Sequence, residues 1–222
     1  MVRAPSDAFS EASAKVVTDL AEVISTHELA ALGVDTPIGL DPEPRPGGRP
    51  ADRAARALLA RMAPDGLRAT GSRVFSAPSA GQLAAWRAGA GYDQVNLVHE
   101  HGPRLTLQAF NILPKIAAAD AMAQGPHGAR LFEVHPEVSF AALADETLPR
   151  KKSATGRARR VELLEGLGFR LAALEAGLGP RAGRWQADDL WDACICCWSA
   201  GRIARGIAWR LPGDGDNGVI WA

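Results

Sequence analysis

The chain lacks several features that assign a protein to a familiar class at once. No apolar run approaches the roughly 20 residues that a membrane-spanning helix needs, and residues 1–10 lack the basic-then-apolar pattern of a signal peptide. There is no Walker-type phosphate loop, Gly-x-Ser-x-Gly elbow or dinucleotide fingerprint. We therefore expect a soluble, cytoplasmic protein without a membrane partner, whose chemistry does not depend on those motifs.

An excess of charge is also lacking, because 25 basic residues balance 25 acidic ones. Net charge therefore does not steer the protein toward nucleic acid, and such an attraction would have to come from a local basic cluster. Lysine is scarce and arginine supplies most of the positive charge.

Cysteine is equally scarce and is confined to Cys194, Cys196 and Cys197. Neighbours on one helix are poorly placed to form disulfides, which fits a reducing compartment. A Cys-x-Cys-Cys metal site would need further ligands, and no second cysteine pair occurs. We interpret the three as small apolar core residues.

The length of 222 residues and an apolar content of 47% predict one domain spanning residues 1–222. Compact apolar runs at residues 29–34 and 131–134 are typical of buried, parallel strands. Residues 1–4 and 12–17 are expected as weaker strands. Helical patterns cover residues 19–27, 51–62, 82–88, 105–123, 159–174 and 187–209, and residues 211–217 are expected as a turn-rich tail. Strands that alternate with helices predict an α/β layered domain.

Asp35 follows the first buried run directly, in Gly33-Val34-Asp35-Thr36-Pro37. Open α/β sheets bind their ligands at the carboxyl ends of their strands, and a carboxylate there is held by rigid backbone. The alternative is a turn aspartate that caps the loop before Pro37. For this residue alone, both interpretations stay open.

Asp189 and Asp192 lie three residues apart, so they share one face of the last predicted helix. Two carboxylates one turn apart can bind a hard cation or bridge two cations, as in phosphoryl chemistry. The alternative is that acids simply suit the positive N-terminal end of a helix. That alternative explains Asp188 and Asp189 better than Asp192, which borders the apolar face.

Glu133 and His135 lie on the same side of the second buried run, because side chains alternate along a strand. Glu133 is a candidate metal ligand, and His135 is a candidate proton carrier or ligand. The alternative is a core histidine with Glu133 paired to an arginine.

A basic segment spans residues 150–160 and carries six positive charges without an acid between them. Such a run suits phosphate contacts on a nucleic acid, although a solvated charged surface is an equally good explanation. A smaller basic set, Arg49, Arg53 and Arg56, begins the helix at residues 51–62 and is expected to reach the same groove.

Six short motifs occur in series, each weak alone and together fairly specific. They are Val34-Asp35-Thr36-Pro37-Ile38-Gly39-Leu40; Arg49-x-x-Asp52-x-x-Ala55-Arg56; Gln108-Ala109-Phe110 with Pro114-Lys115-Ile116; Glu133-Val134-His135-Pro136-Glu137; Lys151-Lys152-x-x-x-Gly156-x-x-x-Arg160; and Asp188-Asp189-x-x-Asp192-Ala193. Their order resembles the predicted RNase H-like nucleases called domain of unknown function 429, from about residue 32 to residue 222.

The resemblance implies an RNase H-like mixed sheet flanked by helices and metal-dependent hydrolysis of phosphodiester bonds with Mg²⁺ or Mn²⁺. The implied catalytic and metal-binding residues are Asp35, Glu133, Asp189 and Asp192, with His135 as a further catalytic candidate. The implied substrate-binding residues are Arg49, Arg56, Lys115, Lys151, Lys152 and Arg160. A DNA or RNA partner is expected.

The chain departs from this pattern at its beginning. RNase H-like enzymes carry a first catalytic aspartate on their first strand, and no acid before Asp35 lies in a convincing strand. We expect the first strand to be missing, either because Met1 is an internal residue of a longer chain or because the protein lacks that aspartate.

Three hypotheses follow. The first is a metal-dependent nuclease or phosphodiesterase, and the second is a catalytically impaired RNase H-like module that binds nucleic acid. The third is a hydrolase of small phosphate compounds, which balanced net charge also allows.

Overall fold

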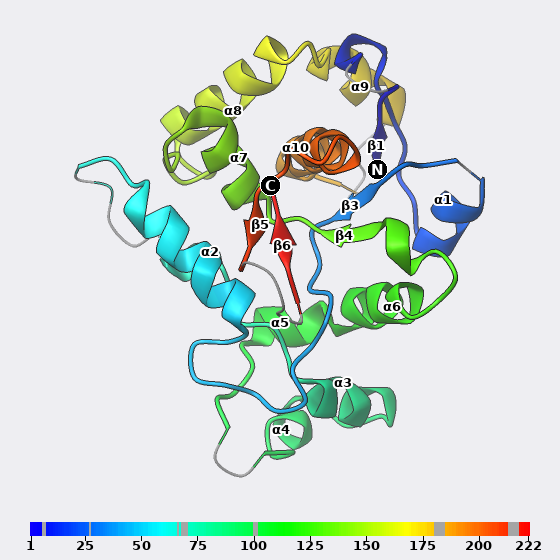
Figure 1. Ribbon diagram of the computed structural model, residues 1–222, viewed down its shortest axis with the longest axis vertical. Helices are drawn as coiled ribbons and strands as arrows, with labels where there is room; N and C mark the ends of the chain where they lie inside the picture. Colours follow the sequence, from blue (N-terminus) through cyan, green and yellow to red (C-terminus); the bar gives the residue numbers. More distant parts are fainter. Residues whose placement is uncertain are drawn as a thin grey trace.

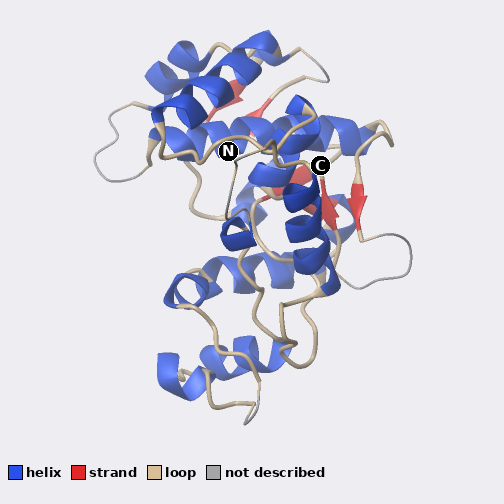
Figure 2. Ribbon diagram, turned by 90° about the vertical axis from the view of Figure 1, so that its left-hand side faces the viewer, coloured by secondary structure: helices blue, strands red, loops and turns tan. Residues whose placement is uncertain are grey.

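The protein is a mixed α/β structure dominated by helices. The computed structural model describes residues 1–5, 8–26, 28–65, 67, 71–99, 102–179, 185–212 and 218–222. Figure 2 shows that the short strands lie in the upper part of the molecule, whereas the lower part consists of helices and loops. The expected α/β class is thus confirmed.

The strands are short and form three pairs. β1 (Val2–Arg3) pairs antiparallel with β2 (Ser13–Ala14), and β3 (Leu32–Val34) pairs parallel with β4 (Leu131–Glu133). β5 (Arg210–Leu211) and β6 (Ile220–Trp221) form an antiparallel pair at the C-terminus. A parallel bridge between Val134 and Trp221 connects this last pair to β4, so the strand order runs β3, β4, β6, β5.

The helices surround these strands (Figure 1). Their bounds are α1 Leu20–Thr26, α2 Pro50–Arg61, α3 Ala80–Arg87, α4 Tyr92–Val95, α5 Leu107–Asn111, α6 Leu113–Ala123, α7 Pro136–Ala144, α8 Ala154–Gly166, α9 Leu171–Leu178 and α10 Ala187–Ala204. Short 3₁₀ turns occur at Phe9–Glu11, Gly71–Arg73 and Gly128–Arg130.

The longest helix, α10, is the centre of the upper part. It packs against α7, α8, β1 and β3 (Figure 1). Its apolar residues join the main hydrophobic core, where Phe9 stacks on Phe169 at 4.7 Å between ring centroids. Cys194 and Cys196 are buried on this helix and Cys197 is partly buried, all three as free thiols, as expected for core residues. The packing therefore fixes the start of α10 beside the end of β3.

Most predicted elements are present, with altered ends. The two buried runs form β3 and β4 in parallel, as the sequence indicated. Pro114 divides the predicted helix 105–123 into α5 and α6, since proline is accepted only in the first turn of a helix. The last helix ends at Ala204 rather than 209, because Gly206 adopts a φ of +70°.

Two segments differ from expectation. The basic segment is helical from Ala154, where the Ser153 hydroxyl accepts a hydrogen bond from the Gly156 backbone N–H. The C-terminal hairpin β5–β6 was missed, because two-residue strands carry no periodicity that sequence patterns can detect. The expected tail 211–217 begins with β5 and Pro212, and its residues 213–217 lie outside the described part of the chain. Among the described residues, no helix is both long and apolar enough to cross a membrane.

Gly33 allows the close approach of α10 to β3. A Cβ atom at this position would lie 2.9 Å from the Cys196 carbonyl oxygen and 2.9 Å from Val134 Cγ2. We expect Gly33→Ala to lower the free energy of unfolding by about 1–3 kcal/mol, because the helix or the strand must shift. Urea denaturation followed by circular dichroism measures this.

The matched control is Gly177→Ala in α9, where an added Cβ meets no atom within 4 Å. That change should raise the stability by about 0.5–1 kcal/mol, as alanine does in a helix. Equal effects of the two substitutions would contradict a tight contact between α10 and β3.

Candidate functional site

A recess of about 1060 Å³ opens beside β3. Its walls include β1, β3, α1 and α6, and small residues of α10 form a further wall, namely Ala193, Cys196, Cys197, Ala200 and Gly201. Asp35, Asp189 and Asp192 also line it. The recess is therefore a largely apolar hollow with a group of carboxylates in its lining.

Asp35 and Asp192 come from the end of β3 and from the second turn of α10. Asp35 reaches solvent through the recess, yet protein surrounds its other sides, and this burial raises the pKa of its carboxyl to about 6. Burial likewise raises the pKa of Asp192 to about 6, and the negative charges of Asp35 and Glu137 add to that rise. The two acids thus lie close enough to repel each other.

Lys151 offsets part of this negative charge. Its Nζ atom lies 2.8 Å from Asp192 Oδ2 and 3.1 Å from Asp188 Oδ2. Burial would lower the pKa of the ammonium group, but these two carboxylates raise it above its usual value. The lysine therefore stays charged, and its charge also opposes the rise in the pKa of Asp35.

Asp189 has a structural task as well. Its Oδ2 atom accepts a hydrogen bond of 2.7 Å from the Gln186 backbone N–H, which completes a capping box at the start of α10. The N-cap of α10 is Gln186, and the helix begins at Ala187, as the sequence predicted. Asp189 is exposed and lines the recess, so the capping role and the site role occur together.

Glu133 is held by an arginine, which was the alternative explanation for its charge. Arg49 Nη2 lies 2.6 Å from Glu133 Oε1, and Arg49 Nη1 lies 2.9 Å from Oε2. The Ile38 backbone N–H also donates to Oε2 at 2.7 Å. Both carboxylate oxygens of the buried Glu133 are therefore engaged with protein donors.

Arg49 is equally committed. It donates to Asp52 Oδ1 at 2.8 Å and to the Ile38 carbonyl oxygen at 2.8 Å, and its side chain is 2% exposed. Burial would lower the pKa of Arg49, but Glu133 and Asp52 raise it above its usual range. The expected substrate-binding residue instead fastens the loop that follows Asp35 to β4 and α2.

His135 lies at the start of α7, directly after β4. Burial lowers the pKa of its imidazole, against the influence of Glu137, Glu133 and Asp192, so the ring is neutral at pH 7. Its buried Nδ1 atom has no hydrogen-bond partner among the described residues. His135 and Asp35 both line a small cavity of about 10 Å³.

The remaining basic candidates divide into buried and exposed groups. Arg160 is fully buried and pairs with Glu137, which also binds Arg73 at 2.8 Å. Arg56 donates to the carbonyl oxygens of Val74 and Gly47. The guanidinium of Arg160 is thus engaged in a salt bridge, and that of Arg56 in hydrogen bonds to carbonyl oxygens. Both residues therefore stabilise the fold.

Lys115 and Lys152 remain exposed. Lys115 lines the recess at the start of α6 and acts electrostatically on Asp35, whereas Lys152 precedes α8, next to Lys151. The structure thus brings together Asp35, Asp192, Asp189, Lys115 and Lys151. It pairs Glu133 with Arg49, and Arg160 with Glu137, in two further ion pairs.

The donor set suits a hard divalent cation, because carboxylate oxygens are the ligands that Mg²⁺ and Mn²⁺ prefer. Asp35 and Asp192 supply two such groups. Within the described residues, no three His, Cys, Asp or Glu side chains form a ligand group. Mg²⁺ often binds through one or two carboxylates and keeps several waters, so the pair fits a weakly held ion.

Sequence reasoning missed the parts played by Asp188 and Glu137. Asp188 was explained as a helix cap, yet it shares Lys151 with Asp192. Glu137 ends the motif in which only Glu133 and His135 were predicted to be site residues. Its negative charge nevertheless contributes to the raised pKa of both Asp35 and Asp192. A signal was present for Asp188 alone, in the run of acids at residues 188–192.

The stability of the protein should depend on the charge of Asp35. An unfolded aspartate titrates near roughly pH 4 and Asp35 in the folded chain at about 6, so the folded state binds more protons in that window. Stability therefore falls as the pH rises through the window, and the loss stays complete above it. We expect Asp35→Asn to stabilise the protein at pH 7.5 by about 1 kcal/mol, discounted for solvent contact.

This gain should vanish at roughly pH 4, where the wild-type carboxyl is protonated in the folded state. Urea titrations of both proteins at the two pH values measure it. A variant that is less stable than the wild type at pH 7.5 would show that Asp35 is not electrostatically strained.

A second prediction concerns the buried ion pairs of Arg49. Arg49→Met leaves Glu133 and Asp52 buried without a counter-charge, so we expect a loss of about 3–5 kcal/mol. Adding Glu133→Gln should recover part of that loss, because one of the unpaired charges is removed. If the double variant is as unstable as the single one, Glu133 is not the partner that matters.

The comparisons with known proteins confirm the family that the sequence resembles, and they do not test its predicted nuclease activity. The model of the family described as protein of unknown function, DUF429, matches residues 3–217. Neither the curated proteins nor the solved structures contain a match to the chain. Since the family model spans nearly the whole sequence, the chain belongs to the DUF429 family.

Proposed function

We propose that the protein is a metal-dependent phosphodiester hydrolase with an RNase H-like fold, and more specifically a nuclease. One observation carries the proposal. Asp35 and Asp192, far apart in the sequence, line the same recess, and burial raises the pKa of both carboxyls to about 6. Carboxylates kept together at such a cost are typical of functional sites.

The fold part of the proposal rests on where these acids lie. β3 and β4 are parallel, α10 packs on β3, and the acids stand at the end of β3 and near the start of α10. In the RNase H-like arrangement that the resemblance implies, a strand with a further aspartate lies beside β3. Under this proposal, the recess bordered by β1 and β3 would correspond to that place.

Asp35 and Asp192 would hold Mg²⁺ or Mn²⁺, with Asp189 at the edge of the recess as a further oxygen donor. The bound ion would supply Lewis acidity toward the phosphate and a more acidic water. Glu133 and Arg49 position the loop that carries Asp35, rather than binding the ion. His135, neutral and lining the same small cavity as Asp35, is able to accept a proton there.

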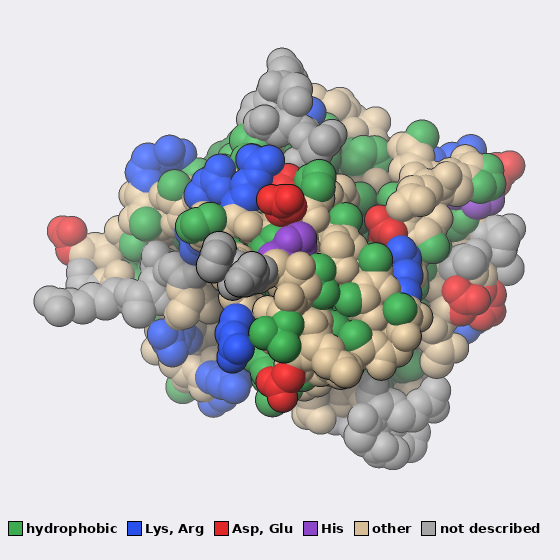
Figure 3. Space-filling view, turned by 90° about the horizontal axis from the view of Figure 1, so that it is seen from below, with side chains coloured by type: hydrophobic (Ala, Val, Ile, Leu, Met, Phe, Trp, Pro, Cys, Tyr) green, Lys and Arg blue, Asp and Glu red, His purple; other side chains and the backbone are tan. Residues whose placement is uncertain are grey.

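Lys115 and Lys152 would contact phosphate groups of the substrate. Acidic and basic side chains are interspersed on the face seen in Figure 3, rather than gathered into one broad basic surface. The balanced net charge favours a short stretch of nucleic acid, or a small phosphodiester, over a long duplex.

The test is hydrolysis of single-stranded, duplex and branched nucleic acids, and of bis(p-nitrophenyl) phosphate, with Mg²⁺ or Mn²⁺. We expect metal-dependent cleavage of at least one substrate. Asp192→Asn should slow it by roughly 100-fold or more, because it weakens both metal binding and charge stabilisation.

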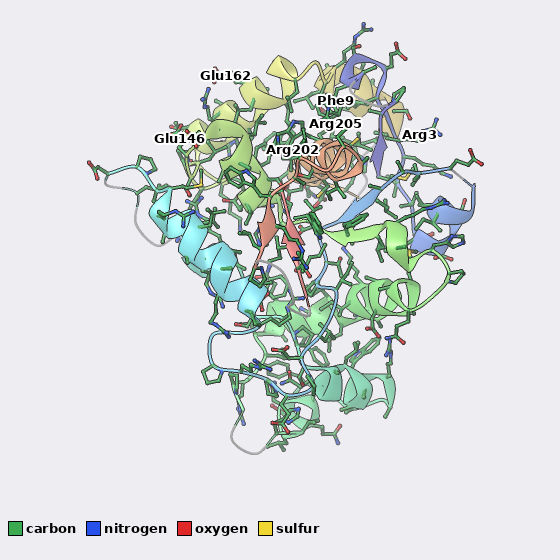
Figure 4. All side chains as sticks on the ribbon, in the orientation of Figure 1. Arg3, Phe9, Glu146, Glu162, Arg202 and Arg205 are labelled. Carbon is green, nitrogen blue, oxygen red and sulfur yellow. The ribbon has the colours of Figure 1, made fainter. Side chains whose placement is uncertain are left out.

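The control is Glu162→Gln on α8, an exposed residue paired with Arg159 at the periphery of the molecule (Figure 4). Its rate should equal that of the wild type. Cleavage that survives Asp192→Asn would exclude the acid pair as the active site. Salt-sensitive binding of nucleic acid without any cleavage would instead favour an RNase H-like binding module, an alternative that the two-carboxylate donor set also supports.

A further inference from the structure

The ammonium group of Lys151 already occupies part of the proposed cation site. It lies 2.8 Å from Asp192 Oδ2 and 3.1 Å from Asp188 Oδ2, so it forms two charge-assisted hydrogen bonds. The side chain of Asp192 is only 17% exposed, and Oδ2 is the oxygen that Lys151 binds. A metal ion that binds Asp192 through this oxygen must displace the ammonium or share the oxygen with it.

The charges of the cluster explain why a cation is needed there. Asp35, Asp188, Asp189 and Asp192 are close in the fold, and Lys151 bonds directly to two of them. Lys115 also acts on Asp35. Without Lys151, Asp192 would lose the one ion pair that it forms within the described part of the chain, while Asp35 and Glu137 continued to repel it. Removing one charge of such a group leaves the others uncompensated.

The position of Lys151 in the chain allows it to leave. It belongs to the short turn between α7 and α8, and its side chain is 35% exposed. Lysine ends in a compact charge on a flexible stem, so the ammonium can move several ångströms by rotation of side-chain bonds alone. Lys152, the next residue in the chain, is exposed, and the exposed Lys115 lines the recess, where a phosphate would enter.

We propose that Lys151 is the built-in counter-ion of the acid pair, which a divalent cation displaces from Asp192 and which then binds the substrate phosphate. This deepens the proposed function and rests on it. Lys151 is thereby a positioning residue that sets the affinity for the metal: its ammonium competes with the ion on the free protein. Release from Asp192 makes its charge available to the phosphate only when the ion is bound.

The experiment measures Mn²⁺ binding by calorimetry at pH 7.5, without substrate. The variants are Lys151→Met, Lys151→Gln and the matched control Lys152→Met. Lys152 is exposed and, among the residues that the structure describes, forms no ion pair with these acids, and its substitution removes the same charge from the adjacent position. Asp192→Asn serves as the variant without the metal ligand, and thermal unfolding shows that each protein is folded.

We expect Lys151→Met to bind Mn²⁺ roughly tenfold more tightly than the wild type, because the competing ammonium is gone. Lys152→Met should leave the affinity within about twofold, and Asp192→Asn should abolish binding. In spite of tighter metal binding, Lys151→Met should hydrolyse substrate more slowly than the wild type, because the phosphate contact is lost. If Lys151→Met does not fold, Lys151→Gln keeps a hydrogen-bond donor without the charge and should show the same tightening.

Unchanged or weaker Mn²⁺ affinity in a folded Lys151 variant would overturn this inference, and metal-dependent cleavage by the wild type would still support the proposed function. Absence of Mn²⁺ binding in the wild type and in both Lys151 variants would overturn it as well. Cleavage by Asp192→Asn would overturn the proposed function itself, since the acid pair would then not be the site. The outcomes therefore separate the two claims.

Discussion

The buried ion network of Arg49 is the interaction on which the site depends. One guanidinium connects β4 through Glu133, α2 through Asp52 and the loop after β3 through the Ile38 carbonyl. Asp52 in turn accepts a hydrogen bond from the Ala77 backbone N–H, and Glu133 accepts one from Ile38. The start of α2, the loop after β3 and the distant strand β4 are thus joined, and the paired charges make a buried arginine tolerable.

The consequence of this network is the placement of Asp35. The residue lies three positions before Ile38, in a loop held at both ends by β3 and by the Arg49 network. Across the recess α10 presents Asp192, and Gly33 allows the helix to approach the strand closely. A rigid support of this kind can keep two carboxyls buried near each other, and this burial raises the pKa of both acids.

A second arginine network supports the other side of the site. Glu137 is paired with both Arg73 and Arg160, and Arg160 also donates to the carbonyl oxygens of Pro149 and Gly156. These contacts hold the turn that carries Lys151 against α7. Gly156 is required at this point, because a Cβ there would lie 2.1 Å from the Arg150 carbonyl oxygen. The basic motif is therefore partly a packing motif, with Lys151 and Lys152 as its outward members.

Much of this architecture is readable in the sequence, and the reason differs from feature to feature. The apolar runs at β3 and β4 predicted buried parallel strands because only such strands need apolar residues on both faces. The order of the motifs indicated the family, and Asp35 and Asp192 were identified as site residues from their positions at a strand end and beside an apolar helix face. Asp188 and Asp189 also carried an alternative explanation as helix-terminal charges, although Asp188 shares Lys151 with Asp192 and Asp189 lines the recess.

The sequence by itself determined the types of most elements, the parallel strand pair and the acids that line the recess, because local periodicity and chain order are enough for these, whereas the hairpin β5–β6 escaped it. Only the tertiary structure decided which charges pair with which. Glu133 pairs with Arg49, Glu137 with Arg160, and Asp192 with Lys151, across separations of 84, 23 and 41 residues. In the sequence, a charged residue that binds a ligand cannot be distinguished from one that pairs with a distant residue of the same chain. Burial and distance distinguish the two, and both arise only when the chain is folded.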